Sequence, residues 1–115
     1  MAGHAQTPSE GTLVERYERA RRNFDAADYA TAARQFAEIV VDEPSNLAAR
    51  LLLARAYYHS AQLSRAERTL REVIERDPTE AYAHLMLGRT LQRQNRHTEA
   101  TGSLRVAAAL TDQYR

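Results

Sequence analysis

The stretches "DEPSNLAARLLLA" (residues 42–54) and "RDPTEAYAHLMLG" (residues 76–88) decide the fold, because each places an apolar run at the same distance behind a proline. Pro78 follows Pro44 at a spacing of 34, which we call the period. A fixed spacing of about 20–50 residues is typical of a chain built from stacked structural units. The rest of the sequence follows the same spacing.

An apolar row with helical spacing recurs one period and then two periods further along the chain. Its four positions fall at i, i+3, i+7 and i+11, which places them on one face of a helix. The helix before each row holds a small residue. The three rows read Tyr29, Ala32, Phe36 and Val40, then Leu63, Ala66, Leu70 and Ile74, then His97, Ala100, Leu104 and Ala108, and the small residues are Ala20, Ala54 and Gly88.

Each copy is therefore predicted to hold two helices. Pro44 and Pro78 are expected to follow the second helix of a copy, since an interior proline costs about 3 kcal/mol. Gly88 gives up about 1 kcal/mol of helix propensity, which favours a second helix packing against its backbone. His97 replaces Tyr29 and Leu63, so we expect it to be packed or half-buried. The predicted helices are 13–26 with 29–42, 47–60 with 63–76, and 81–94 with 97–111.

The chain resembles the tetratricopeptide repeat family over "LLLARAYYHSAQLSRAERTLREVIERDP" (residues 51–78) and "LMLGRTLQRQNRHTEATGSLRVAAAL" (residues 85–110). The resemblance implies an all-α fold, a right-handed α-solenoid of three helix-turn-helix repeats with six antiparallel helices. The repeat domain is expected at 13–115, as repeats of about 13–46, 47–80 and 81–114. Residues 1–12 are expected to form a disordered tail. The family's usual tryptophan near the repeat start is replaced by Arg16, Arg50 and His84.

The first copy departs from the pattern. Arg19 and Asn23 stand where the later copies have Leu53 and Tyr57, then Leu87 and Leu91. One explanation is that the end repeat exposes this face as a polar cap. The other is a slip of one residue, which would make Tyr17 and Phe24 the core residues. The sequence leaves both open.

Composition narrows the possible chemistry. The chain has 115 residues, no cysteine and a net charge of +1, with arginine at all 16 basic positions. Its histidines form no i, i+4 pair, and it has no Gly-rich phosphate loop. We therefore expect no cofactor, no metal and no enzyme activity. The arginine usage suggests a GC-rich bacterial genome, and the start does not resemble a signal peptide, so a cytoplasmic location is expected.

The resemblance implies that the first helices of the three copies line a concave groove that binds a peptide or helix. Arg21, Arg55 and Arg89 recur there with the same period, and aromatic residues lie beside them in the sequence pattern. The hypothesis is a partner segment with Asp or Glu near an apolar anchor, and the alternative is that the arginines form only a solvated face. The candidate groove residues are Tyr17, Arg21, Phe24, Leu51, Arg55, Tyr58, Tyr82, Leu85, Arg89 and Arg93.

Two other functions stay open. Leu104 and Ala108 leave an apolar strip on the last helix, so the chain could self-associate there, as a monomer or weak homodimer. Residues 1–46 hold five arginines and eight acids, and residues 47–115 hold eleven arginines and seven acids, which would also allow head-to-tail contacts. RNA binding is the less favoured function, and no nucleic-acid partner is expected, because the net charge is small. No membrane partner is expected, because the longest apolar run is far short of the roughly 20 residues that a membrane span needs.

Overall fold

The helix boundaries repeat with the period of the sequence. The computed structural model describes residues 11–112, which contain no strand. Residues 1–10 of the predicted disordered tail and residues 113–115 lie outside the described part. The described helices are α1 (Leu13–Asp25), α2 (Tyr29–Asp42), α3 (Leu47–His59), α4 (Leu63–Arg76), α5 (Ala81–Arg93) and α6 (His97–Asp112). The predicted all-α fold of six helices is confirmed, with each boundary within one residue.

The turn inside each repeat has one conformation, repeated three times. The residue after the first helix and its cap is in the left-handed region, with φ of 62° at Ala27, 60° at Ala61 and 62° at Asn95. The next N–H donates to a carbonyl five residues earlier, as from Asp28 to Asn23 at 2.9 Å. This is the Schellman motif, which satisfies carbonyls at the end of a helix. It ends the three first helices one residue before the predicted position.

The turn between repeats contains the prolines, as predicted. α2 ends at Asp42 and α4 ends at Arg76, two residues before Pro44 and Pro78 respectively. The next helix then begins behind a side-chain cap, which supplies an acceptor for an otherwise unpaired N–H. At α3, Asn46 Oδ1 accepts a hydrogen bond from the N–H of Ala49 at 3.0 Å.

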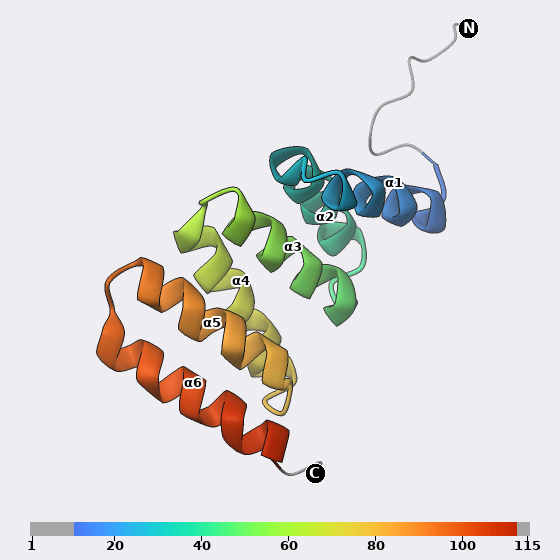
Figure 1. Cartoon of the computed structure of the whole chain (residues 1–115). Coiled ribbons are helices and arrows are strands. Elements are labelled where there is room, and N and C mark those ends of the chain that lie inside the picture. Colours follow the sequence, from blue (N-terminus) through green and yellow to red (C-terminus); the bar gives the residue numbers. More distant parts are fainter. Residues whose placement is uncertain (1–10, 113–115) are drawn as a thin grey trace, which may run out of the picture.

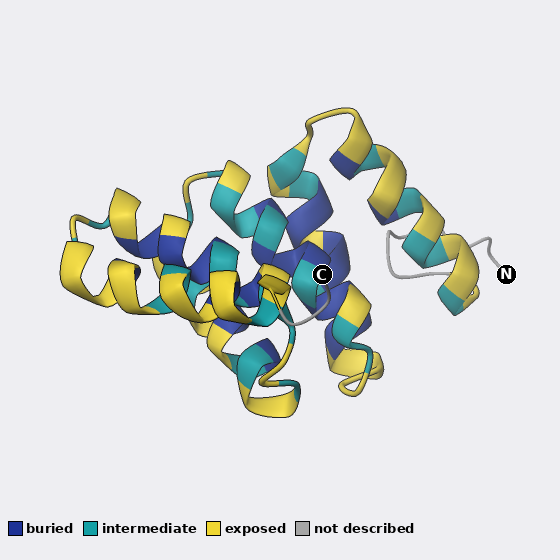
Figure 2. Ribbon diagram, turned by 60° about the horizontal axis from the view of Figure 1, so that its bottom comes forward, coloured by how far each residue is buried: buried dark blue, intermediate teal, exposed yellow. Residues whose placement is uncertain are grey.

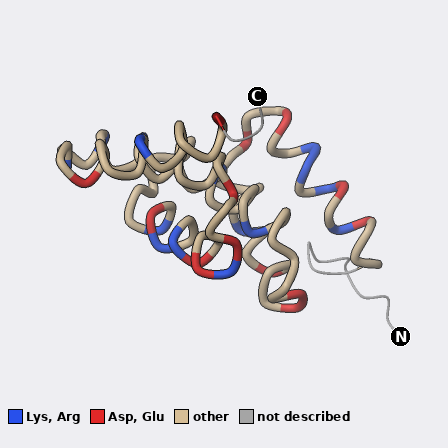
Figure 3. Tube along the Cα trace, turned by 90° about the horizontal axis from the view of Figure 1, so that it is seen from below, with Lys and Arg blue, Asp and Glu red and all other residues tan. Residues whose placement is uncertain are grey.

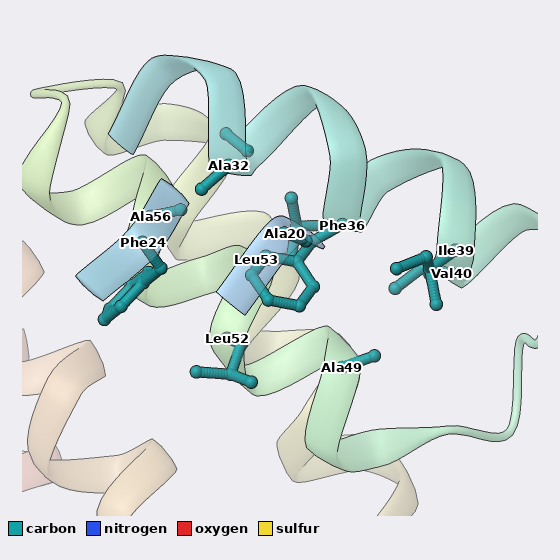
Figure 4. Close-up of a cluster of buried hydrophobic side chains, with 11 residues drawn as sticks. Ala20, Phe24, Ala32, Phe36, Ile39, Val40, Ala49, Leu52, Leu53 and Ala56 are labelled. Atoms are coloured by element: carbon teal, nitrogen blue, oxygen red, sulfur yellow. The ribbon is translucent and has the colours of Figure 1, made fainter. Parts of the chain in front are cut away.

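The three helix pairs stack in chain order, so the N-terminal and C-terminal helices lie at opposite ends of an elongated molecule of 57 × 28 × 22 Å (Figure 1). Buried residues are concentrated in the middle of the stack (Figure 2). They form two clusters, each where a first helix packs against the preceding pair. In the first, α3 meets α1 and α2 (Figure 4). In the second, α5 meets α3 and α4, with one residue from α6.

The first repeat keeps the same register as the others, which excludes the one-residue slip. Its two helices begin one full period before those of the second repeat. Phe24 is nevertheless buried and Tyr17 half-buried in this ungapped register. The polar face is half-buried rather than an exposed cap, and Asn23 Nδ2 donates to Oε1 of the buried Gln35 at 2.8 Å.

The backbone of Gly88 is covered by α6, as predicted. A Cβ at this position would lie 2.6 Å from Leu104 Cδ2, closer than side chains pack. The prediction for His97 is wrong, because its side chain is exposed. Its counterpart Tyr29 is covered by His59 at the end of the following first helix, and no such helix follows α6 within residues 11–112.

No helix in the described part combines the length and apolar character that crossing a membrane requires.

Candidate peptide-binding surface

Arg55 connects all three repeats on the side where α1, α3 and α5 follow one another. It lies on α3, and its guanidinium carbon is 5.0 Å from the ring centroid of Phe24 on α1. The same carbon is 5.4 Å from the ring centroid of Tyr82 on α5. Both distances are within the range of cation–π attraction. The cation is therefore held between two rings from neighbouring repeats.

The charge of Arg55 has no anionic partner in residues 11–112. The side chain is half-buried, and its Nε is buried without a hydrogen-bond partner. Arg50, on the same helix, also has a buried Nε without a partner, but its Nη1 lies 2.8 Å from Glu72 Oε1, so its charge is paired. The charge of Arg55 lies between two rings without an anion, which makes its guanidinium group a candidate to bind a carboxylate from outside the described chain.

A second arginine and further rings lie next to this position. Arg93 holds its guanidinium carbon 4.7 Å from the Tyr58 ring centroid, and its Nη1 donates to the Tyr58 carbonyl oxygen at 3.0 Å. His59 stacks on Tyr29 with 4.6 Å between ring centroids. His59 also meets the edge of Tyr58 at 5.4 Å. We call these residues the aromatic–arginine cluster: Phe24, Tyr29, Arg55, Tyr58, His59, Tyr82 and Arg93.

The environment of His59 disfavours its protonated form. Partial desolvation beside the rings lowers its pKa below the ordinary value of 6.5, and the positive charges of Arg55 and Arg93 lower it further. His59 is not among the residues predicted from the sequence. Its position four residues after Arg55 on one helix is the signal that could have found it, since such residues are neighbours on a helix surface.

The structure places the other predicted groove residues in different environments. Phe24, predicted as a groove residue, is 8% exposed and belongs to the first core cluster. It is covered by Arg55 and by Tyr29, whose ring centroid is 5.2 Å away. Tyr17 is half-buried against Phe36, with ring centroids 5.7 Å apart.

The predicted row of three arginines is not uniform. Arg21 is exposed and pairs with Asp25 on its own helix at 3.3 Å. Arg89 is exposed, whereas Arg55 is half-buried between rings. The row therefore contains one enclosed cation and two at the surface. Leu51 and Leu85, also predicted for the groove, are half-buried.

An open pocket of about 700 Å³ lies between α5 and α6, and we call it the terminal pocket. It joins two residues predicted for the groove, Tyr82 and Leu85, with the two predicted for self-association, Leu104 and Ala108. From the sequence, these two pairs were expected to lie on different surfaces. Besides these four residues, the lining includes Ala107 and Thr111.

Within residues 11–112, no three His, Asp or Glu side chains come together in a way that could hold a metal ion.

Comparison with solved structures shows the same fold in longer proteins. MamA (41-end) from Desulfovibrio magneticus RS-1 matches with a TM-score of 0.79 and 23% identity, over 84% of this chain and 55% of that chain. The Yersinia enterocolitica type III secretion translocator chaperone SycD matches with a TM-score of 0.81 and 21% identity, over 91% and 80% respectively. A chain of the CopN–Scc3 complex matches with a TM-score of 0.81 and 21% identity, over 85% and 58%.

Sequence comparison identifies the family. No curated protein matches the chain. Two sequence profiles, both described as tetratricopeptide repeat, match residues 23–86 and residues 60–115. The first covers more than half of the chain, and the two together reach all three helix pairs. The chain therefore belongs to the tetratricopeptide repeat family.

Proposed function

We propose that this chain is a protein-interaction module that binds a partner segment containing Asp or Glu through the aromatic–arginine cluster. The observation that carries the proposal is the enclosed cation of Arg55, which has two aromatic neighbours and no anionic partner in residues 11–112. Membership of a family whose members typically mediate protein interactions supports the general class. Two solved structures with the same fold, a translocator chaperone and a chain of a two-protein complex, fit that class.

The chemistry of the cluster favours a carboxylate over a neutral ligand. A guanidinium presents a planar fork of donors that pairs with both oxygens of a carboxylate. The rings on either side reduce the access of water, which strengthens such a pair relative to one at an open surface. Tyr82 is partly exposed beside Arg55 and provides apolar area for a neighbouring side chain of the partner.

The experiment selects ligands without assuming their identity. The full chain is used to select short peptides from a random display library, and the selected peptides are measured by isothermal titration. We expect the selected peptides to carry Asp or Glu beside a large apolar residue. Arg55→Ala should weaken their binding by about 1–3 kcal/mol, the usual cost of losing a central arginine at an interface.

Arg68→Ala is the matched control, because Arg68 is an exposed arginine on α4, away from the cluster. It should leave affinity unchanged. Replacing the peptide's Glu by Gln should cost as much as Arg55→Ala, and the two changes together should cost little more than either alone. If the Arg55 and Arg68 variants lost equal amounts of peptide affinity, the arginines would form only a solvated face, and the proposal would be refuted.

A further inference from the structure

The terminal pocket occupies the position where another first helix would pack if the repeat continued. Its residues Leu85, Leu104, Ala107 and Ala108 correspond, one period earlier, to Leu51, Leu70, Val73 and Ile74. Those four form part of the second core cluster or pack against it, together with Ala83, Met86 and Leu87 of α5. The residues two periods earlier likewise form part of the first core cluster, which includes α3, or pack against it. They are Tyr17, Phe36, Ile39 and Val40. Two of the three equivalent surfaces are thus covered by a helix of known sequence.

We propose that the terminal pocket binds an amphipathic helix of a partner protein, lying parallel to α5. The two internal helices define the required face, which has small residues at its two ends and two large apolar residues between them. In α3 these are Ala49, Leu52, Leu53 and Ala56, all buried. In α5 they are Ala83, Met86, Leu87 and Thr90, also buried. The terminal pocket adjoins the aromatic–arginine cluster at Tyr82, which lines the pocket and packs against Arg55, but Arg55 itself does not line the pocket.

The terminal pocket leaves more space than the two equivalent surfaces that α3 and α5 cover. This space determines the size of the side chains that the pocket accepts. Ala107 and Ala108 replace Val73 and Ile74 of the second repeat. Leu104 is half-buried and Ala108 exposed, whereas the corresponding Leu70 is fully buried beneath α5. Filling the extra space requires larger apolar residues than the alanines of α3 and α5, since tight packing determines the strength of such a contact.

A second copy of this chain does not supply a suitable helix through its free N-terminal end. The positions of α1 that correspond to the four contact residues of α3 are Glu15, Glu18, Arg19 and Arg22. Acidic and basic residues follow one another along α1 (Figure 3). Placing these charges in an apolar pocket would cost more than the contact returns. This argues against the head-to-tail contact that the charge distribution alone would allow.

The charges at the rim agree with the proposed direction of the helix. α1, α3 and α5 run in the same direction (Figure 1). Glu80, before the start of α5, and Asp112, at the end of α6, both line the same end of the terminal pocket. A helix parallel to α5 would bring its N-terminus to this end, where its partial positive charge is favourable beside carboxylates.

Three fluorescent peptides test the proposal against the full chain by anisotropy. The first has the sequence of residues 45–62, which contains α3, and the second has leucine in place of Ala49 and Ala56. The third has the sequence of residues 11–28, which contains the charged α1. We expect the leucine peptide to bind most tightly, the natural α3 sequence more weakly, and the α1 sequence not to bind.

Matched variants of α6 locate the binding. Ala108→Arg places a large charged side chain in the terminal pocket, whereas Ala109→Arg makes the same change at an exposed neighbour outside it. The first should weaken binding of the leucine peptide at least about tenfold and the second should not, while Arg68→Ala at an exposed position on α4 leaves it unchanged. Failure of the leucine peptide to bind, or equal effects of the two α6 variants, would overturn the proposal. A dimer in sedimentation that Ala108→Arg dissociates would show a second copy in the pocket instead, which also overturns it.

Discussion

Arg50 and Arg55 differ in which groups face their guanidinium groups. That difference separates a structural arginine from a candidate binding residue. Arg50 is 6% exposed, donates to the carbonyl oxygen of Pro44 at 2.8 Å and pairs with Glu72. His84, its counterpart one repeat later, lies 2.8 Å from the carbonyl oxygen of Pro78 through Nε2. These residues fasten the turn between repeats, at the position where the family usually has tryptophan. Arg55 faces rings alone.

Removing Arg50 should destabilise the fold without affecting the aromatic–arginine cluster. Arg50→Ala leaves the Pro44 carbonyl and Glu72 without their partner, so we expect the free energy of unfolding to fall by about 2–4 kcal/mol. Urea denaturation measures the change. Arg68→Ala, at an exposed position, should change it by less than about 0.5 kcal/mol. A similar small effect at Arg50 would show that its two contacts contribute little to stability.

The lowered pKa of His59 makes part of the stability depend on pH. The unfolded chain binds a proton on this histidine more readily than the folded chain does, so its contribution is complete above about pH 6.5 and is lost as the pH falls below that value. His59→Phe keeps an aromatic ring in the stack and should reduce the loss of stability between pH 7 and pH 5.

Nuclear magnetic resonance titration of the imidazole tests the cause directly. Its pKa should be below 6.5 in the free protein and should rise when an acidic peptide binds, since a carboxylate near Arg55 and Arg93 offsets their charge. An imidazole that titrates at 6.5 or above in the free protein would contradict this account of the cluster.

At the scale of elements, the sequence was sufficient where a local signal determined the backbone. The helix pairs could be predicted from the repeat period, from Pro44 and Pro78 and from the helical apolar rows. Each of these signals depends only on residues close in the sequence or on which side of a helix faces solvent. Contacts between repeats were harder to predict. Burial of Phe24, burial of Arg50 and the stacking of His59 on Tyr29 all depend on which residues of another helix lie opposite, and a single repeated row does not contain that information.

The contact between Gly88 and Leu104 provides a test at this scale. Gly88→Ala gains about 1 kcal/mol of helix propensity but places a methyl group against Leu104, so we expect a net loss of about 1–2 kcal/mol in the free energy of unfolding. In a Leu104→Ala background the methyl group has room, and the same change should be neutral or stabilising. Equal effects of Gly88→Ala in the two backgrounds would show that Leu104 does not determine the glycine.

At the scale of the whole molecule, three helix pairs give the chain two chemically distinct regions. The aromatic–arginine cluster draws residues from all three repeats, so only the stacked array creates it. The terminal pocket is lined by residues of α5 and α6 and of their flanks, and within residues 11–112 no further helix covers it. The residues predicted from the sequence include five of the seven in the cluster and four of the nine that line the pocket, yet Tyr82 and Leu85 were not expected to share a pocket with Leu104 and Ala108.

The central claim is that Arg55 receives the carboxylate of a partner. The most direct measurement is the side-chain Nε–H resonance of Arg55 during titration with a selected acidic peptide, compared with the same peptide carrying Gln in place of its Glu. Because the guanidinium group of Arg55 has no anionic partner in residues 11–112, a carboxylate that pairs with it should change the environment of this resonance, so we predict a large, saturable shift with the acidic peptide and none with the Gln peptide. Saturable binding of the acidic peptide that leaves the Arg55 resonance unmoved would contradict the claim.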